Sequence, residues 1–131
     1  MKSTKEIKDL EDIKLLVDDF YGRIRKDELL ADIFNSVIQD RWPDHLEKMY
    51  TFWQTILLKE HTYFGSPFPP HASLPVQTVH FERWLGLFHA TLDDYFHGET
   101  AEEAKWRAIR MAEMFLMKIE YYQNSDTKPL I

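Results

Sequence analysis

One histidine of this chain lies in an unusually stiff setting. His71 stands within the segment "PFPPHASLP", which runs from Pro67 to Pro75. Because proline fixes φ and removes a backbone donor, a long helix cannot pass through this segment. Neutral imidazole is a common metal ligand, so a histidine held in so short a frame is a candidate for presenting its ring in one orientation.

A second histidine shares a helix face with apolar residues. In the stretch "RWPDHLEKMYTFWQTILL", His45 precedes Met49, Phe52 and Trp53 by 4, 7 and 8 positions. Residues at these offsets lie on one side of a helix, so the imidazole faces the same way as the apolar stripe. A half-buried histidine near a helix start would explain this residue by itself.

Tyr21 and Trp84 are polar aromatic residues on stripes that otherwise look like core. Tyr21 lies beside Val17 and Ile24, and Trp84 is spaced with Phe88 on a later helix. Buried phenol and indole groups need hydrogen-bond partners. Each residue taken singly is explained by core packing, whereas the combination indicates a pocket with polar groups.

Several familiar chemistries lack their residues. The chain has no cysteine, which excludes disulfides and thiolate chemistry. It contains no His-Glu-x-x-His zinc motif, no Glu-x-x-His pair and no glycine-rich phosphate loop. A serine hydrolase would need a strand–turn–helix elbow, and we predict no strands. Helical histidines among many aromatics instead suit haem. Spacing alone leaves His71 and His80 as alternative iron ligands.

Composition and length indicate one all-α domain. The 131 residues include 15% aromatics and carry a formal net charge of −6, which argues against a nucleic-acid partner. No apolar run is long enough for a membrane span and no signal peptide is visible, so we predict a cytoplasmic protein with no membrane partner. We predict a single domain over 1–131, with flexible ends at 1–4 and 123–131.

Apolar periodicity predicts five helices and no strand. The first begins at a capping box formed by Ser3 and Glu6, and the fifth begins at a second such box formed by Thr100 and Glu103. The other three are expected at about 28–37, 43–58 and 78–96. The long connection at 59–77 is aromatic as well as proline-rich, so we expect it to be ordered and functional.

Four stretches in this order resemble the group III truncated haemoglobins. They are "FYGRIRKDELLADIFN", "WPDHLEKMYTFWQTILL", "YFGSPFPPHASLP" and "HFERWLGLF", and the resemblance spans about residues 13–117. It implies a trimmed globin fold in which two helical pairs sandwich haem b. Other truncated globins have paired glycines; group III lacks them, and they are absent from this sequence as well.

The resemblance also implies a role for individual residues. His71 would be the proximal iron ligand, which decides between it and His80. Tyr21, His45 and Trp84 would be the distal residues that stabilise a bound ligand, and His45 would either bind iron or gate the pocket. The remaining haem contacts would be Phe34, Met49, Phe52 and Trp53, with Lys48, Tyr63, His80 and Arg83 as candidate partners of the propionates.

The implied function is the binding of oxygen, nitric oxide and carbon monoxide at a pentacoordinate iron. Distal donors would slow oxygen release, which favours redox chemistry on oxygen, nitric oxide or peroxide over bulk transport. One alternative is a peroxidase-like or nitric-oxide-oxidising enzyme, whose reductase the chain does not encode. Another is a helical interaction module without a cofactor, which would be colourless when purified.

Overall fold

The computed structural model describes residues 3–63 and 75–124, the last three of them by backbone alone. This part of the chain forms five helices, which are α1 (Leu10–Ile24), α2 (Ala31–Ile38), α3 (Trp42–Leu58), α4 (Thr78–Tyr95) and α5 (Glu99–Asn124). The β pairing within it is one isolated bridge between Lys5 and Phe96. The predicted all-α class is confirmed.

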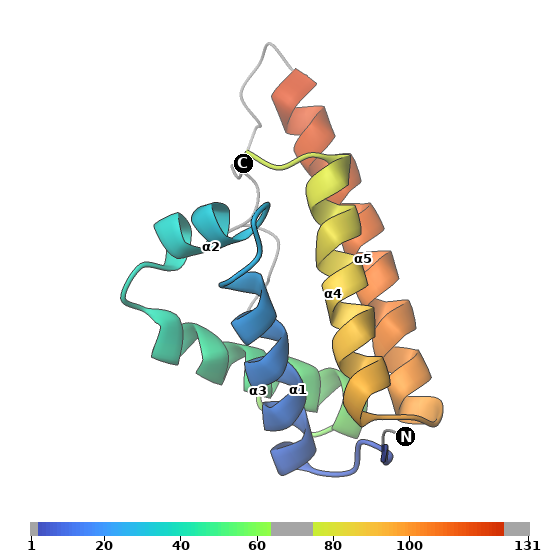
Figure 1. Cartoon of the computed structure of the whole chain (residues 1–131). Helices are drawn as coiled ribbons and strands as arrows, with labels where there is room; N and C mark the ends of the chain where they lie inside the picture. The colour runs from blue at the N-terminus through green and yellow to red at the C-terminus, as the bar shows by residue number, and fades with distance from the viewer. Residues whose placement is uncertain (1–2, 64–74, 125–131) are drawn as a thin grey trace.

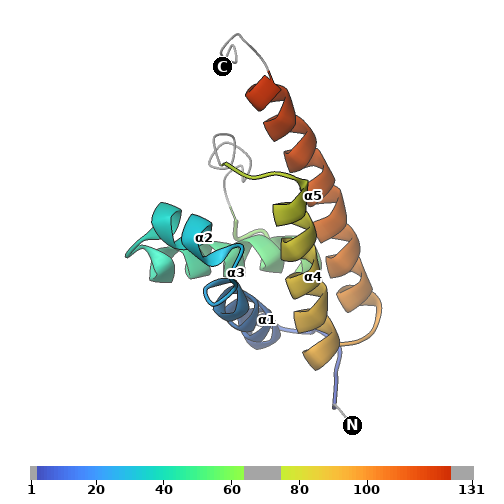
Figure 2. The ribbon, with the colours of Figure 1, turned by 45° about the horizontal axis from the view of Figure 1, so that its top comes forward.

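The helices pack as two layers around an apolar centre. Figure 1 shows α4 and α5 lying antiparallel along one side, with α1 and α3 crossing on the other. α1 contacts both α3 and α4, so it joins the two layers. α2 lies at the far side of α1 from α5 in both views (Figures 1 and 2). This arrangement is the predicted two-over-two sandwich.

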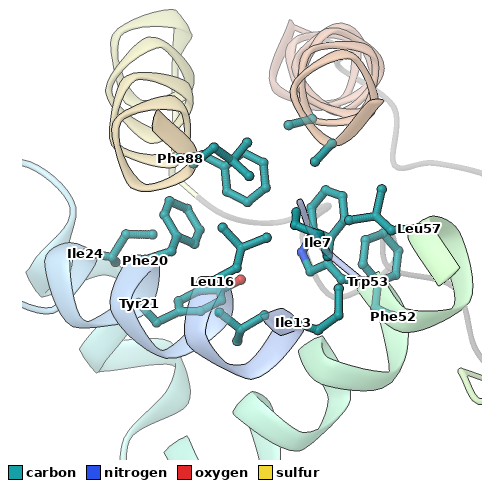
Figure 3. Packing of buried hydrophobic residues seen from close by; sticks show 14 of the residues in the cluster. Ile7, Ile13, Leu16, Phe20, Tyr21, Ile24, Phe52, Trp53, Leu57 and Phe88 are labelled. Atoms are coloured by element: carbon teal, nitrogen blue, oxygen red, sulfur yellow. The ribbon is translucent and has the colours of Figure 1, made fainter. Parts of the chain in front are cut away.

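The apolar stripe of α1 forms the middle of the core. Ile13, Leu16, Phe20 and Ile24 are essentially inaccessible to solvent. Figure 3 shows Phe20 pointing across to Phe88 of α4, and their ring centroids are 5.0 Å apart in an edge-to-face arrangement. The 3.6-residue periodicity of the sequence therefore identified the buried face correctly.

Two predicted helix starts are wrong. α1 begins after Asp9, whose side chain accepts a hydrogen bond from the backbone N–H of Asp12, so Asp9 is the N-cap in place of Ser3. The preceding residues extend alongside the α4–α5 turn, where Thr4 hydrogen-bonds His97. α5 begins at Glu99, which places the predicted cap Thr100 inside the helix.

The other boundaries agree with expectation within a few residues. Pro43 lies in the first turn of α3, where its missing N–H costs no helical hydrogen bond. α3 ends at Leu58, and the next residue, Lys59, adopts a left-handed backbone with φ of 58°. Gly98 has φ of 100° just before α5, and a Cβ there would collide with the side chain of Glu6. A glycine is thus required at the α4–α5 turn.

Candidate functional site

An apolar cavity lies between the helical layers and is lined by residues from all five helices and their connections. The space between its side chains measures about 860 Å³, including the part that opens to solvent. Its lining is made of Tyr21, Leu30, Phe34, His45, Met49, Phe52, Trp53, Val76, His80, Phe81, Trp84, Met111, Ala112, Phe115 and Ile119. A mostly apolar space with few polar groups is typical of a ligand or cofactor site.

The buried apolar residues that the structure describes form two clusters, and Met111 packs against both. The larger one contains Phe52 and Trp53 of α3. The smaller one consists of Val76, Phe115 and Ile119. Side chains from both clusters line the cavity. Since protein interiors normally pack without gaps, a core split in this way indicates room for a large apolar group between the halves.

Two polar aromatic rings, those of Tyr21 and His45, line the cavity, and a third ring, that of Trp42, packs against both. Tyr21 of α1 meets His45 of α3 edge to face, with ring centroids 4.9 Å apart. Trp42 packs against the same two rings, with its centroid 5.9 Å from that of Tyr21 and 5.5 Å from that of His45. The guanidinium carbon of Arg25 lies over the Trp42 ring, 4.6 Å from its centroid. The rings hold Tyr21 and His45 in fixed positions beside the cavity.

The hydroxyl of Tyr21 is a donor available to the cavity. The residue is buried, and within residues 3–63 and 75–121 no group hydrogen-bonds its hydroxyl. Burial raises the pKa of Tyr21 well above its ordinary value. The phenol therefore keeps its proton at neutral and moderately alkaline pH, and it can donate a hydrogen bond to a small ligand.

Trp84 lies on the α4 wall of the cavity within a stack of rings. It is parallel to Phe88, with centroids 5.6 Å apart, and it meets Phe20 edge to face at 5.4 Å. Trp53 of α3 also stacks on Phe88, with ring centroids 5.1 Å apart. These contacts fix the indole against the cavity. Its N–H makes no hydrogen bond to any described residue.

His80 stands at the amino end of α4 and lines the cavity there. Its Nδ1 accepts a hydrogen bond of 2.9 Å from the backbone N–H of Gln77, which forms a capping box. In a neutral ring the proton must then reside on Nε2. Nε2 is consequently a donor, and it has no lone pair to offer a metal.

Arg83 is held by an acid at the turn between α1 and α2. Its guanidinium lies 2.6 Å from a carboxylate oxygen of Asp27, whose side chain is almost fully buried. Burial alone would raise the pKa of the Asp27 carboxyl. Hydrogen bonds from Arg83 and from the backbone N–H groups of Leu30 and Leu29 instead hold this pKa below its usual value.

Most residues predicted for the site line this one cavity. The predicted residues found in the lining are Tyr21, Phe34, His45, Met49, Phe52, Trp53, His80 and Trp84. Lys48 is exposed, Tyr63 packs against Phe52, and Arg83 pairs with Asp27; none of these three is part of the lining. His71 lies outside the described residues.

The sequence reasoning missed the α5 wall of the cavity. This wall consists of Met111, Ala112, Phe115 and Ile119. Three further lining residues that it missed lie outside α5; they are Leu30, Val76 and Phe81. Ala112, Phe115 and Ile119 belong to the predicted apolar stripe of α5, but periodicity does not distinguish a residue that packs against another helix from one that faces a cavity. It also missed Trp42, whose indole N–H donates to the Asn35 side chain at 3.1 Å and thereby braces the ring that packs against Tyr21 and His45.

Comparison with known proteins gives a consistent result. The model of the bacterial-like globin family matches residues 6–118. The group 3 truncated hemoglobin of Campylobacter jejuni is 36% identical over 109 residues, which are 80% of this chain and 86% of the relative. The crystal structure of the group III truncated hemoglobin from Campylobacter jejuni superimposes with a TM-score of 0.81 at 34% identity, over 93% of this chain and 98% of the other.

The chain therefore belongs to the bacterial-like globins and, within them, to the group III truncated haemoglobins. Membership implies binding of haem and of diatomic gases. Within the described ranges, no helix has both the length and the apolar character needed to cross a bilayer. The described ranges also contain no cluster of three or more His, Cys, Asp or Glu side chains that could bind a metal ion.

Proposed function

We propose that the cavity binds haem b, that His71 is the axial ligand of the iron, and that the protein binds oxygen and related gases for redox chemistry. The observation that carries this proposal is the meeting of Tyr21, His45 and Trp84 at the lining of one otherwise apolar space. Three residues from three helices, each explained singly by core packing, thus bring polar groups to one pocket for a flat ligand.

The lining fits a porphyrin in shape and chemistry. Aromatic rings from α2, α3 and α4 surround the space, and the two halves of the core stand on either side of it. Haem, when bound, would supply an iron that His71 would hold and that can bind a diatomic gas.

The tautomer of His80 supports His71 as the ligand. The alternative iron ligand left by the spacing argument is His80, but its Nδ1 accepts the Gln77 N–H, so Nε2 carries the proton of the neutral ring. A ligating imidazole needs the opposite arrangement, in which the other ring nitrogen donates. We therefore assign the iron to His71 and give His80 a donor's role.

That donor suits a haem propionate. His80 lies at the amino end of α4, where helix N–H groups favour negative charge. Arg83 follows on the same helix and could add positive charge, although it already pairs with Asp27. Lys48 and Tyr63 are the further candidates, from α3 and from the segment after it. A propionate at the α4 start would thus have one hydrogen-bond donor and a favourable field.

On the ligand side, Tyr21 and Trp84 act as hydrogen-bond donors. A gas ligand that draws negative charge accepts such bonds, and a hydrogen bond to a charged acceptor contributes about 1.5–3 kcal/mol. One donor then changes affinity by roughly 10–100-fold. Two donors slow release, which suits chemistry on oxygen, nitric oxide or peroxide better than bulk delivery. Electrons for turnover come from a separate reductase.

The test is an optical spectrum of the purified protein in ferric, ferrous and carbon-monoxide-treated states, repeated for His71→Ala. We expect a Soret band that shifts on reduction and again with carbon monoxide, and we expect its axial signature to be lost in the variant. The matched variant His80→Gln should keep the axial signature. Colourless protein that takes up no haemin would instead favour the cofactor-free interaction module.

A further inference from the structure

The outward face of α5 carries large apolar side chains that nothing described in the chain covers. Trp106 is 56% exposed, Met114 43% and Met117 70%. They lie opposite the buried Ala104 and Ala108, which face the core. In Figures 1 and 2, α5 runs along the outer edge of the ribbon, and no other helix lies on its outward side. Exposed apolar stripes of this kind mark interaction sites.

Two opposite charges interrupt this stripe near its middle. Arg110 and Glu113 are both exposed, and neither forms an ion pair with any described residue. The neighbouring charges behave differently, because Arg107 pairs with Glu103 one turn earlier at 3.2 Å. The stripe thus offers one cation and one anion, three positions apart, that are not used within the chain.

We propose that this face is the interface of a homodimer, in which α5 packs antiparallel against α5 of a second copy. The order of the residues has the symmetry that such a pairing requires. Arg110 and Glu113 lie at equal distances from a midpoint between Met111 and Ala112, and Trp106 and Met117 lie at equal distances from the same midpoint. A twofold axis there places each Arg110 opposite a Glu113, and each Trp106 opposite a Met117.

This self-complementarity selects a second copy over another occupant. In a twofold interface, residue i meets residue j while j meets i, so a homodimer needs matched pairs about one centre. The outward stripe supplies two apolar pairs and two ion pairs that are related by this symmetry. Tryptophan, methionine and arginine are also the residues that interfaces favour, with charge at the centre tolerated when it is paired.

Sedimentation velocity of the full-length protein over a range of concentrations tests the proposal. We expect a concentration-dependent dimer. Glu113→Arg and Arg110→Glu each oppose like charges across the axis and should raise the dissociation constant about tenfold or more. The double variant Arg110→Glu with Glu113→Arg exchanges the partners and should restore the dimer.

The control is Glu28→Arg, which makes the same charge change at an exposed site in the turn between α1 and α2 and should leave the dimer intact. Circular dichroism shows whether each variant keeps its helix content. A wild-type chain that remains monomeric at high concentration overturns the proposal, as does a double variant that dimerises no better than the single ones. Either result would stand regardless of whether the protein binds haem.

Discussion

At the scale of single residues, the hydroxyl of Tyr21 is the atom on which ligand affinity should depend most. Replacing Tyr21 by Phe removes that donor and leaves the ring contacts with His45 and Trp42 in place. Because the hydroxyl bonds to none of the described residues, the fold should lose little stability. We expect oxygen to dissociate roughly 10–100-fold faster, as measured by stopped-flow.

Tyr95→Phe is the matched control for this change. It deletes the same atom from a residue on α4 whose hydroxyl bonds Asp19 at the surface, away from the cavity lining. Gas kinetics should not change in that variant. If Tyr21→Phe and Trp84→Phe both released oxygen at the wild-type rate, the indole and phenol would have no role in holding the ligand.

The raised pKa of Tyr21 gives a second prediction at this scale. Folding favours the protonated phenol, so the stabilising effect is complete below the unfolded pKa of about 10 and is lost as the pH rises above it. Between pH 7 and 9, oxygen dissociation should therefore not depend on ionisation of this group. A stopped-flow series across that range checks this, and a several-fold acceleration by pH 9 that Tyr21→Phe abolishes would contradict it.

At the scale of elements, the ion pair of Asp27 with Arg83 fastens the α1–α2 turn to α4. Asp27→Asn should destabilise the protein by about 1–3 kcal/mol, because it weakens a buried acceptor of three hydrogen bonds. The pKa of Asp27 is lowered, so its contribution is present above pH 4 and disappears as the pH falls through the folded value. Urea unfolding at pH 7 and pH 3 measures both effects. A difference from wild type that is equally large at pH 3 would show that the carboxylate charge is not its cause.

The start of α1 gives a prediction that separates the structure from the sequence pattern. Asp9→Ala should cost about 1 kcal/mol, since Asp9 caps the helix by accepting from the Asp12 N–H. Ser3→Ala, at the position favoured by the sequence, should cost nearly nothing. Thermal unfolding of the two variants checks this. A larger loss of stability for Ser3→Ala would mean that the first helix begins at Ser3, as the sequence pattern predicts.

The two positions also show what a sequence conveys about elements. The periodicity of the apolar residues identified all five helices, because a helix that buries one face has apolar residues at regular helical intervals. Helix ends depend on tertiary contacts that the local pattern does not carry. Ser3 has the right spacing to Glu6, but Lys5 pairs with Phe96 and draws these residues out of the helix. For the site, spacing singled out Tyr21, His45 and Trp84 and the resemblance assigned their roles, whereas the α5 wall follows only from the packing of the helices.

At the scale of the whole molecule, the division of the core predicts that haem completes the fold. The main cluster and the cluster of Val76, Phe115 and Ile119 meet across a cavity, so a ligand there joins both. Binding to the folded state alone stabilises it by about 2.7 kcal/mol at a free ligand concentration of 100 times Kd. For a chain of this size that is roughly 10 °C in Tm, which a thermal scan with and without haemin measures.

Two buried alanines on α5 make this prediction specific to the cavity. Ala112 lines it, whereas Ala108 packs in the main cluster and is not part of the lining. Ala112→Leu puts methyl groups into open space, so the haem-free protein should keep its Tm while the shift caused by haemin shrinks. Ala108→Leu overpacks a filled region and should lower stability by about 1–3 kcal/mol, yet leave the shift unchanged. Equal shifts in both variants would mean that the space beside Ala112 is not where the porphyrin binds.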